Sequence, residues 1–150
     1  MHSRAVVAMF LACALIASVP SAAKAPPPTM MSNVYRLAEA AAVLHVCAGS
    51  AAAKSLSSER AQHLQGLIGR IAAVIRNIAG HYKDDELLTT FEMTKAKIAD
   101  EPEMQGYVER KYQDCGERLF QDMEAYVAEN EKLINGYFTR QSTVNKGAAR

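Results

Sequence analysis

Three cysteines are the side chains of this chain best suited to redox or metal chemistry. They occupy positions 13, 47 and 115, so that Cys47 and Cys115 are 68 residues apart. A redox-active dithiol usually places its two cysteines two residues apart, and a metal site would need more ligands. In an oxidising compartment, two such distant cysteines typically form a structural disulfide. We therefore expect a Cys47–Cys115 bridge if the chain is exported.

The histidines and carboxylates show no recognisable catalytic or metal-binding pattern. No two of His45, His63 and His81 are spaced by four residues, and neither a His-Glu-x-x-His motif nor a nucleophile elbow occurs. A di-metal site in a helical bundle would need Glu-x-x-His on an inward face, which is also absent from the sequence. We therefore expect no catalytic residue, no metal and no cofactor.

Charge is segregated along the chain although the net charge is only +1, which gives no field to recruit nucleic acid. Residues 84–131 carry 14 acidic and five basic side chains, whereas residues 24–83 carry two acidic and seven basic ones. Acidic helices packing beside more basic ones would explain this pattern. The alternative is an acidic face that docks a basic partner. The candidate residues of that face are Glu109, Asp114, Glu117 and Asp122.

Tyrosines are frequent in the second half of the chain, at positions 107, 112, 126 and 137. A tyrosine at helical spacing usually lies in the core with its hydroxyl at the rim. The alternative is that these four side chains line a ligand pocket.

The amino terminus has the pattern of a secretory signal peptide. Arg4 precedes an apolar run over residues 5–19, and the small residues 21–23 fit the cleavage rule of signal peptidase. About 15 apolar residues are too few for a membrane span, which needs roughly 20. We expect cleavage after residue 23, with cleavage after Ala25 and lipid attachment at Cys13 as the alternatives.

The rest of the chain has the pattern of helices joined by short connections. Apolar residues recur at steps of three and four over residues 33–53, 58–79, 84–99 and 102–138. This period is typical of helices and not of strands. We expect an all-α protein, a small antiparallel bundle of about four helices. The last helix would be the longest, with a kink or break at Gly116 or an overhang near Gly136.

Residues at the helix ends carry capping signals. Ser32 is a candidate N-cap of the first helix, Ser57 and Ser58 are candidates for the second, and Gly80 suits the C-cap of the second helix. Asp84 and Asp85 suit the positive end of the third helix. The expected organisation is a signal peptide over 1–23, a proline-rich linker over 24–31, a bundle domain over 32–139 and a flexible tail over 140–150.

One set of residues resembles a small family of exported proteins from alphaproteobacteria that has no established activity. It comprises Leu37-Ala38-Glu39, then Leu44-His45 and Cys47 in the same helix, and later Tyr112-x-x-Cys115. The chain departs from the family pattern in two ways. Cys47 follows His45 by two residues, whereas the family pattern places the cysteine about one helical turn further along, and the chain has no tryptophan. The resemblance implies a helical periplasmic protein with paired cysteines and adds no catalytic residue.

These patterns favour a non-catalytic periplasmic or secreted protein that binds another envelope or secreted protein. Two alternatives remain open. One is a chaperone, an inhibitor or an immunity-type module that docks through the acidic segment 84–131. The other is a ligand carrier or an enzyme with an unrecognised pocket in the bundle. The sequence leaves the oligomeric state open.

Overall fold

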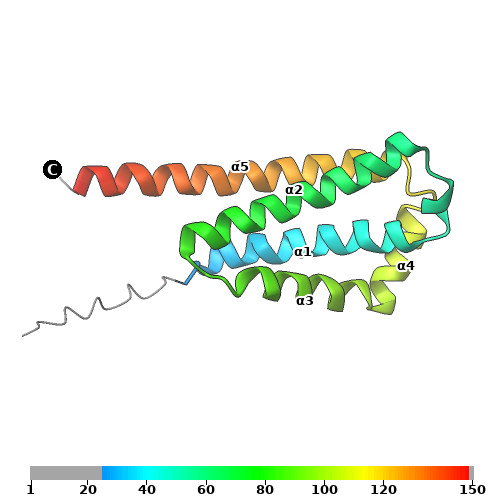
Figure 1. Ribbon diagram of the computed structural model, residues 1–150, viewed down its shortest axis with the longest axis horizontal. Helices are drawn as coiled ribbons and strands as arrows, with labels where there is room; N and C mark the ends of the chain where they lie inside the picture. The colour runs from blue at the N-terminus through cyan, green and yellow to red at the C-terminus, as the bar shows by residue number, and fades with distance from the viewer. Residues whose placement is uncertain (1–24, 149–150) are drawn as a thin grey trace, which may run out of the picture.

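The chain is all-helical in a computed structural model that describes residues 25–148, with side chains described as far as residue 144. The signal peptide expected over 1–23 lies outside the described residues. No strand occurs between residues 25 and 148. The elements are α1 (Pro28–Gly49), a 3₁₀ turn η1 (Ala52–Ser55), α2 (Ser58–Tyr82), α3 (Leu87–Ala99), α4 (Pro102–Lys111) and α5 (Glu117–Ala148) (Figure 1).

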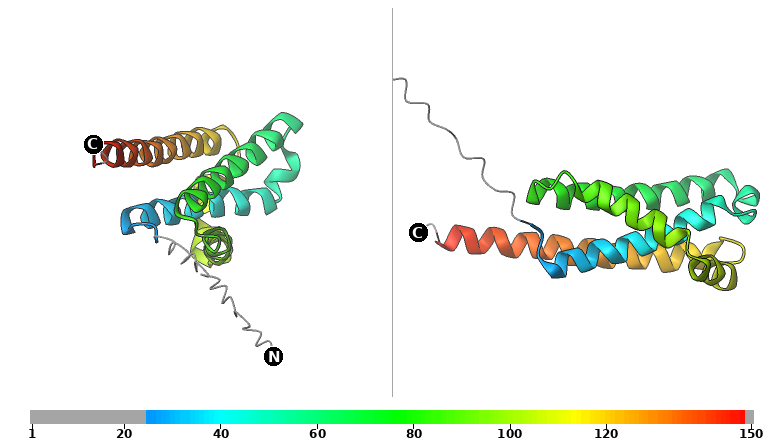
Figure 2. Two further views of the ribbon diagram at one scale, coloured as in Figure 1. Left: turned by 60° about the vertical axis from the view of Figure 1, so that its left-hand side comes forward. Right: turned by 90° about the horizontal axis from the view of Figure 1, so that it is seen from below.

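The four longer helices run in alternating directions, and α1 lies at the centre of the bundle (Figure 1). Helices α3 and α5 lie on opposite sides of α1 and α2, and the short α4 closes one end (Figure 2). Helix α1 packs most extensively against α3. Its small side chains permit this close approach, because Ala38, Ala41 and Ala42 are all buried. The core is completed by apolar stripes of α2 and α5.

The prediction of about four helices is corrected to five α-helices, because the segment after Pro102 is divided in two. The predicted break at Gly116 is confirmed, since α4 ends at Lys111 and α5 begins at Glu117. Cys115 has a φ of 46° in the connection, and the N–H of Gly116 donates to Asp114 Oδ1 at 3.0 Å. A Cβ atom at Gly116 would lie 2.6 Å from Asp114 Oδ2. A side chain at position 116 would therefore displace the Asp114 carboxylate from the position in which it accepts the N–H of residue 116.

Helix α1 begins at Pro28 and not after Ser32, so the linker expected over 24–31 is partly helical. The carbonyl of Pro27 accepts hydrogen bonds from the N–H groups of Met30 and Met31. Proline is tolerated in a first helical turn because its missing N–H would have no partner there. Burial of Met30, which is 1% exposed, favours the extra turn.

Two further helix ends differ from the predictions, and one agrees. Helix α2 continues past Gly80 to Tyr82, whose side chain is buried, and Lys83 takes the left-handed C-cap conformation instead. Asp84 and Asp85 lie in a turn before α3, where Asp84 Oδ1 accepts from the N–H of Glu86 and does not cap the helix. Of the two candidate N-caps of α2, Ser57 is the N-cap, since its side chain accepts from the N–H of Arg60, and Ser58 is the first residue of the helix.

Helix α5 extends to Ala148, so the predicted boundary at residue 139 falls inside a helix. Side chains as far as Phe138 and Gln141 contact the end of α2. Beyond them α5 projects past the bundle (Figure 1), which matches the overhang that the sequence predicted. Across the part of the chain that the structure describes, no helix combines the length and apolarity needed to cross a bilayer.

Candidate functional site

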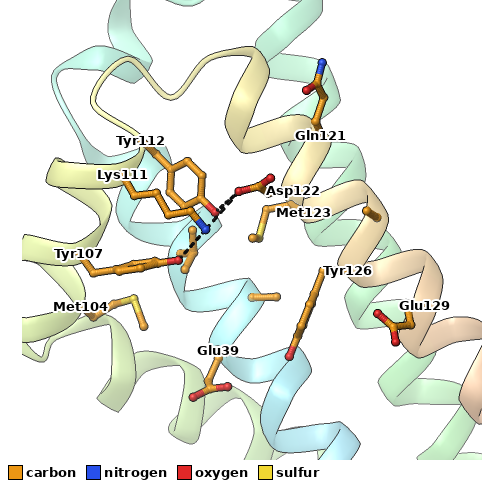
Figure 3. Close-up of a pocket in the computed structure, with 13 residues that line it drawn as sticks. Glu39, Met104, Tyr107, Lys111, Tyr112, Gln121, Asp122, Met123, Tyr126 and Glu129 are labelled. Carbon is orange, nitrogen blue, oxygen red and sulfur yellow. Dashed lines mark hydrogen bonds and ion pairs between the residues drawn. The ribbon is translucent and has the colours of Figure 1, made fainter.

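A groove of about 730 Å³ lies between α1, α4 and α5. We call it the α1–α4–α5 groove. Tyr107 of α4 and Tyr126 of α5 stand on its two sides (Figure 3), and Ala40 and Val43 of α1 also line it. The methyl side chain of Ala40 is too short to fill the space between α4 and α5. The other lining residues are Glu39, Met104, Lys111, Tyr112, Gln121, Asp122, Met123, Ala125 and Glu129.

One end of the groove holds a network of charged and phenolic groups (Figure 3). Lys111 Nζ lies 3.2 Å from Asp122 Oδ2 and donates to the hydroxyl of Tyr107 at 3.0 Å. The hydroxyl of Tyr112 donates to the same carboxylate oxygen at 2.8 Å. The ammonium group also lies 5.4 Å and 4.9 Å from the ring centres of Tyr107 and Tyr112, within cation–π range. The network joins α4 to α5 across the break between them.

The network shifts the pKa values of Asp122, Lys111 and Tyr112. The hydrogen bond from Tyr112, reinforced by Lys111, holds the pKa of Asp122 below its usual value. The hydrogen bond to Tyr107 raises the pKa of Lys111. Burial raises the pKa of Tyr112 to about 12, and its hydrogen bond to Asp122 acts in the same direction. At neutral pH the groove therefore holds a charged Lys111–Asp122 pair and a neutral phenol.

The other end of the groove is acidic. Glu39 and Glu129 lie at its mouth (Figure 3), and neither makes an ion pair within residues 25–144. Burial is the main cause that raises the pKa of Tyr126. The negative charges of Glu39 and Glu129 raise it further, and the positive charge of Arg36 lowers it. The groove therefore has apolar and aromatic sides, a neutralised ion pair at one end and two carboxylates at the other.

The four acidic residues predicted as an interaction face lie in different settings. Asp122 lines the groove and is paired with Lys111. Glu109 lines a second, smaller cavity of about 380 Å³. Asp114 accepts the N–H of Gly116, and Glu117 accepts from Gln121 at 3.0 Å. Of these four residues, only Asp122 lines the α1–α4–α5 groove.

The predicted cysteine pair is brought together. The Sγ atoms of Cys47 and Cys115 lie at disulfide-bonding distance, with their Cα atoms 5.9 Å apart. Both side chains are buried, and the hydroxyl of Ser50 lies 3.4 Å from Cys115 Sγ. The pair joins the end of α1 to the α4–α5 connection, next to the smaller cavity. This placement fits a structural bridge that fixes the break between α4 and α5.

The histidines are dispersed over the bundle. His63 lies 2.7 Å from Glu124 and stacks on Phe120, so that it joins α2 to α5. His81 packs against Phe138, and His45 lies at the smaller cavity. Arg70 forms a two-point ion pair with Glu131, again between α2 and α5. Within the described residues, no three His, Cys, Asp or Glu side chains gather as a possible metal site.

Part of the groove corresponds to the alternative interpretation of the four tyrosines as a pocket lining. Tyr107, Tyr112 and Tyr126 line the groove, and Tyr137 is not among its lining residues. Lys111, Glu39 and Glu129 were not singled out. The spacing of Tyr107 and Lys111, which is i to i+4 on one helix, is the available signal for their contact. Nothing in the sequence signals that α1 lines the same groove, because that depends on how the helices pack.

Comparisons with known proteins give no further information about this site. No protein-family model matches the chain, and no curated protein or solved structure matches it either.

Proposed function

We propose that this chain is an exported, non-catalytic helical protein that acts in the periplasm or cell envelope by binding another polypeptide in its α1–α4–α5 groove. The observation that supports this proposal is the groove itself, with tyrosine and methionine sides and with the two carboxylates of Glu39 and Glu129 at one end. Aromatic residues and methionine are the types enriched where proteins bind one another.

The lining favours a segment that is both apolar and basic. Met104, Met123 and Tyr126 offer adaptable apolar contacts to a side chain that enters the groove. Glu39 and Glu129 would attract a lysine or arginine next to that side chain, and tyrosine rings add cation–π attraction. The surrounding segment 84–131, with its net charge of −9, would also speed the approach of a basic partner.

The chemistry of Lys111 supports binding and not catalysis. A nucleophilic lysine needs a lowered pKa, which an apolar site or another cation provides. Here the hydrogen bond to Tyr107, with further contributions from Tyr112 and Asp122, raises the pKa of Lys111. Its ammonium group is therefore a fixed charge that organises one end of the groove.

A second candidate function is transport of a small amphipathic molecule. The volume of about 730 Å³ falls in the range of small-molecule sites, about 300–1,000 Å³. Native mass spectrometry of the purified exported protein separates the two functions, since a carrier would retain a small molecule that denaturation releases.

Site-specific photo-crosslinking in cells tests the main proposal. A photo-reactive phenylalanine analogue is placed at Tyr107, in the groove, or at Tyr35, which is 52% exposed on α1 and is not a lining residue. We expect one defined crosslinked polypeptide in the envelope fraction from position 107, lost on Glu39→Lys, and none from position 35. Equal capture from both positions, or capture unaffected by Glu39→Lys, would overturn the proposal. Fractionation of the same cells tests export.

A further inference from the structure

Four side chains form an apolar stripe along α5 that begins in the groove and ends on the overhang. Tyr126, Leu133, Tyr137 and Val144 follow one another at steps of seven, four and seven. At 3.6 residues per turn these steps keep all four within about 20° of one line, over about 27 Å of helix. Leu133 and Val144 are 47% and 69% exposed, so the stripe reaches the surface between the groove and the overhang.

Charge changes sign along the same helix. The groove end carries Asp122 and Glu129, within the segment of net charge −9. The far end is basic, since residues 132–150 carry four basic side chains and no acidic one. Arg140 and Lys132 are exposed there. The acidic groove end of the stripe is thus complementary in charge to its basic C-terminal end.

The stripe is also symmetric about its own middle. Tyr126 and Val144 are equally distant from position 135, and so are Leu133 and Tyr137. Two copies of α5 laid antiparallel about that point would place Val144 of each copy on Tyr126 of the other. The same register brings Arg140 of one copy close to Glu129 of the other. Such self-complementarity is the property that a two-fold dimer interface requires.

We propose that the polypeptide bound at the groove is the C-terminal part of α5 from a second copy of this chain, in an antiparallel two-fold dimer. This inference rests on the proposed function, because it identifies the basic, apolar segment that the groove takes. Packing against the second copy would also stabilise the helical overhang, because an isolated helical end of a few residues has little stability in water. The second copy's helix covers Leu133 and Val144 and neutralises Glu129.

Oligomeric state in solution is the first test, made on the full exported chain by sedimentation or light scattering. Val144 and Met93 form a matched pair, because each is 69% exposed while Met93 lies on α3, away from the stripe. We expect a dimer whose dissociation constant rises at least about tenfold with Val144→Glu and is unchanged with Met93→Glu. A monomer at all concentrations up to about 1 mM would overturn the inference.

A charge swap tests the register. Glu129→Lys and Arg140→Glu should each weaken the dimer, and the double variant should restore it, because each change then meets its opposite in the other copy. Both positions are exposed, so circular dichroism should show unchanged folding. A dimer that is insensitive to these changes would overturn the inference.

Crosslinking from position 107, in the groove, distinguishes failure of the dimer from failure of the proposed function. If crosslinking from position 107 captures a different polypeptide while the protein is monomeric, the dimer is wrong and the proposed function stands. If the protein is monomeric and position 107 captures nothing, both are wrong. A crosslinked product of twice the mass of the chain, containing only its own peptides, supports both.

Discussion

The hydroxyl of Tyr112 donates a 2.8 Å hydrogen bond to Asp122 Oδ2, and this bond spans the break between α4 and α5. Tyr112 is 2% exposed and lies outside helical geometry, with a φ of −129°. Its burial and this bond hold the residue that follows α4 against the second turn of α5. The contact positions Lys111 at the same time, because that ammonium group lies 3.2 Å from the shared oxygen. One tyrosine thus supports both the turn and the polar end of the groove.

Replacement of Tyr112 by phenylalanine should remove a pH dependence at the alkaline side. The pKa of Tyr112 is raised to about 12 in the folded state, from 10.0. A raised pKa means that its contribution to stability is complete below about pH 10 and is lost as pH rises toward 12. We expect the free energy of unfolding of the wild type to fall over that range. Tyr112→Phe should weaken this fall and cost about 1 kcal/mol at neutral pH.

The control for this experiment is Tyr107→Phe, since Tyr107 is 39% exposed on the same helix. Urea denaturation at several pH values between about 8 and 12 measures both variants. An alkaline fall of the same size in Tyr112→Phe and the wild type would contradict the assignment.

Replacement of Asp122 by asparagine should remove a pH dependence at the acidic side. The folded pKa of Asp122 is lowered from 3.8 by Tyr112 and Lys111. A lowered pKa gives a contribution that is present above about pH 4 and is lost as pH falls through the folded value. Asp122→Asn should therefore show a smaller loss of stability below about pH 4 than the wild type, measured by thermal unfolding. Asp114→Asn, in the connection between α4 and α5, is the control, and an unchanged acid profile in Asp122→Asn would exclude this role.

Removal of the Cys47–Cys115 bridge should destabilise the bundle strongly. The loop that it closes spans 68 residues, and the chain-entropy relation gives roughly 4 kcal/mol for a loop of that order. Cys47→Ala, Cys115→Ala and the double variant should all melt several degrees below the oxidised wild type. Reduced wild type should melt with them. Thiol titration of the exported wild type should find no free thiol, and two free thiols would contradict the bridge.

The sequence predicted the helices and the cysteine pairing well, because both depend on local or countable features. Period and length identify helices over most of the chain, and the expected removal of a signal peptide would leave only Cys47 and Cys115 to pair. The end of α2 was misplaced because Gly80 is a strong local signal, whereas burial of Tyr82 extends the helix by tertiary packing. The groove was only partly foreseen, since Lys111 meets Asp122 solely because the break turns α4 toward α5.

Glycine at position 83 should stabilise the protein. Lys83 has a φ of 53° at the C-cap of α2, where a residue with a Cβ atom incurs a steric cost of roughly 1 kcal/mol that glycine does not. The greater flexibility of glycine in the unfolded chain offsets part of the gain. We expect Lys83→Gly to raise the free energy of unfolding by a few tenths to about 1 kcal/mol. Lys83→Ala, which loses the charge but keeps the Cβ atom, is the control, and equal stabilisation by both would assign the effect to charge.

The side chain of Asn130 should destabilise the fold, and Asn130→Leu should raise the free energy of unfolding. Asn130 is 2% exposed on the core face of α5, and its Nδ2 donates to the carbonyl of Tyr126 at 2.8 Å. Its Oδ1 is buried without a hydrogen-bond partner among the described residues. An unsatisfied buried acceptor costs about 1–3 kcal/mol, so Asn130→Leu should raise the free energy of unfolding by about 1 kcal/mol or more. Asn130→Asp should lower it, because a carboxylate there would be buried without a cation. A loss of stability in Asn130→Leu would mean that the amide is satisfied in solution and that its hydrogen bonds fix the packing of α5.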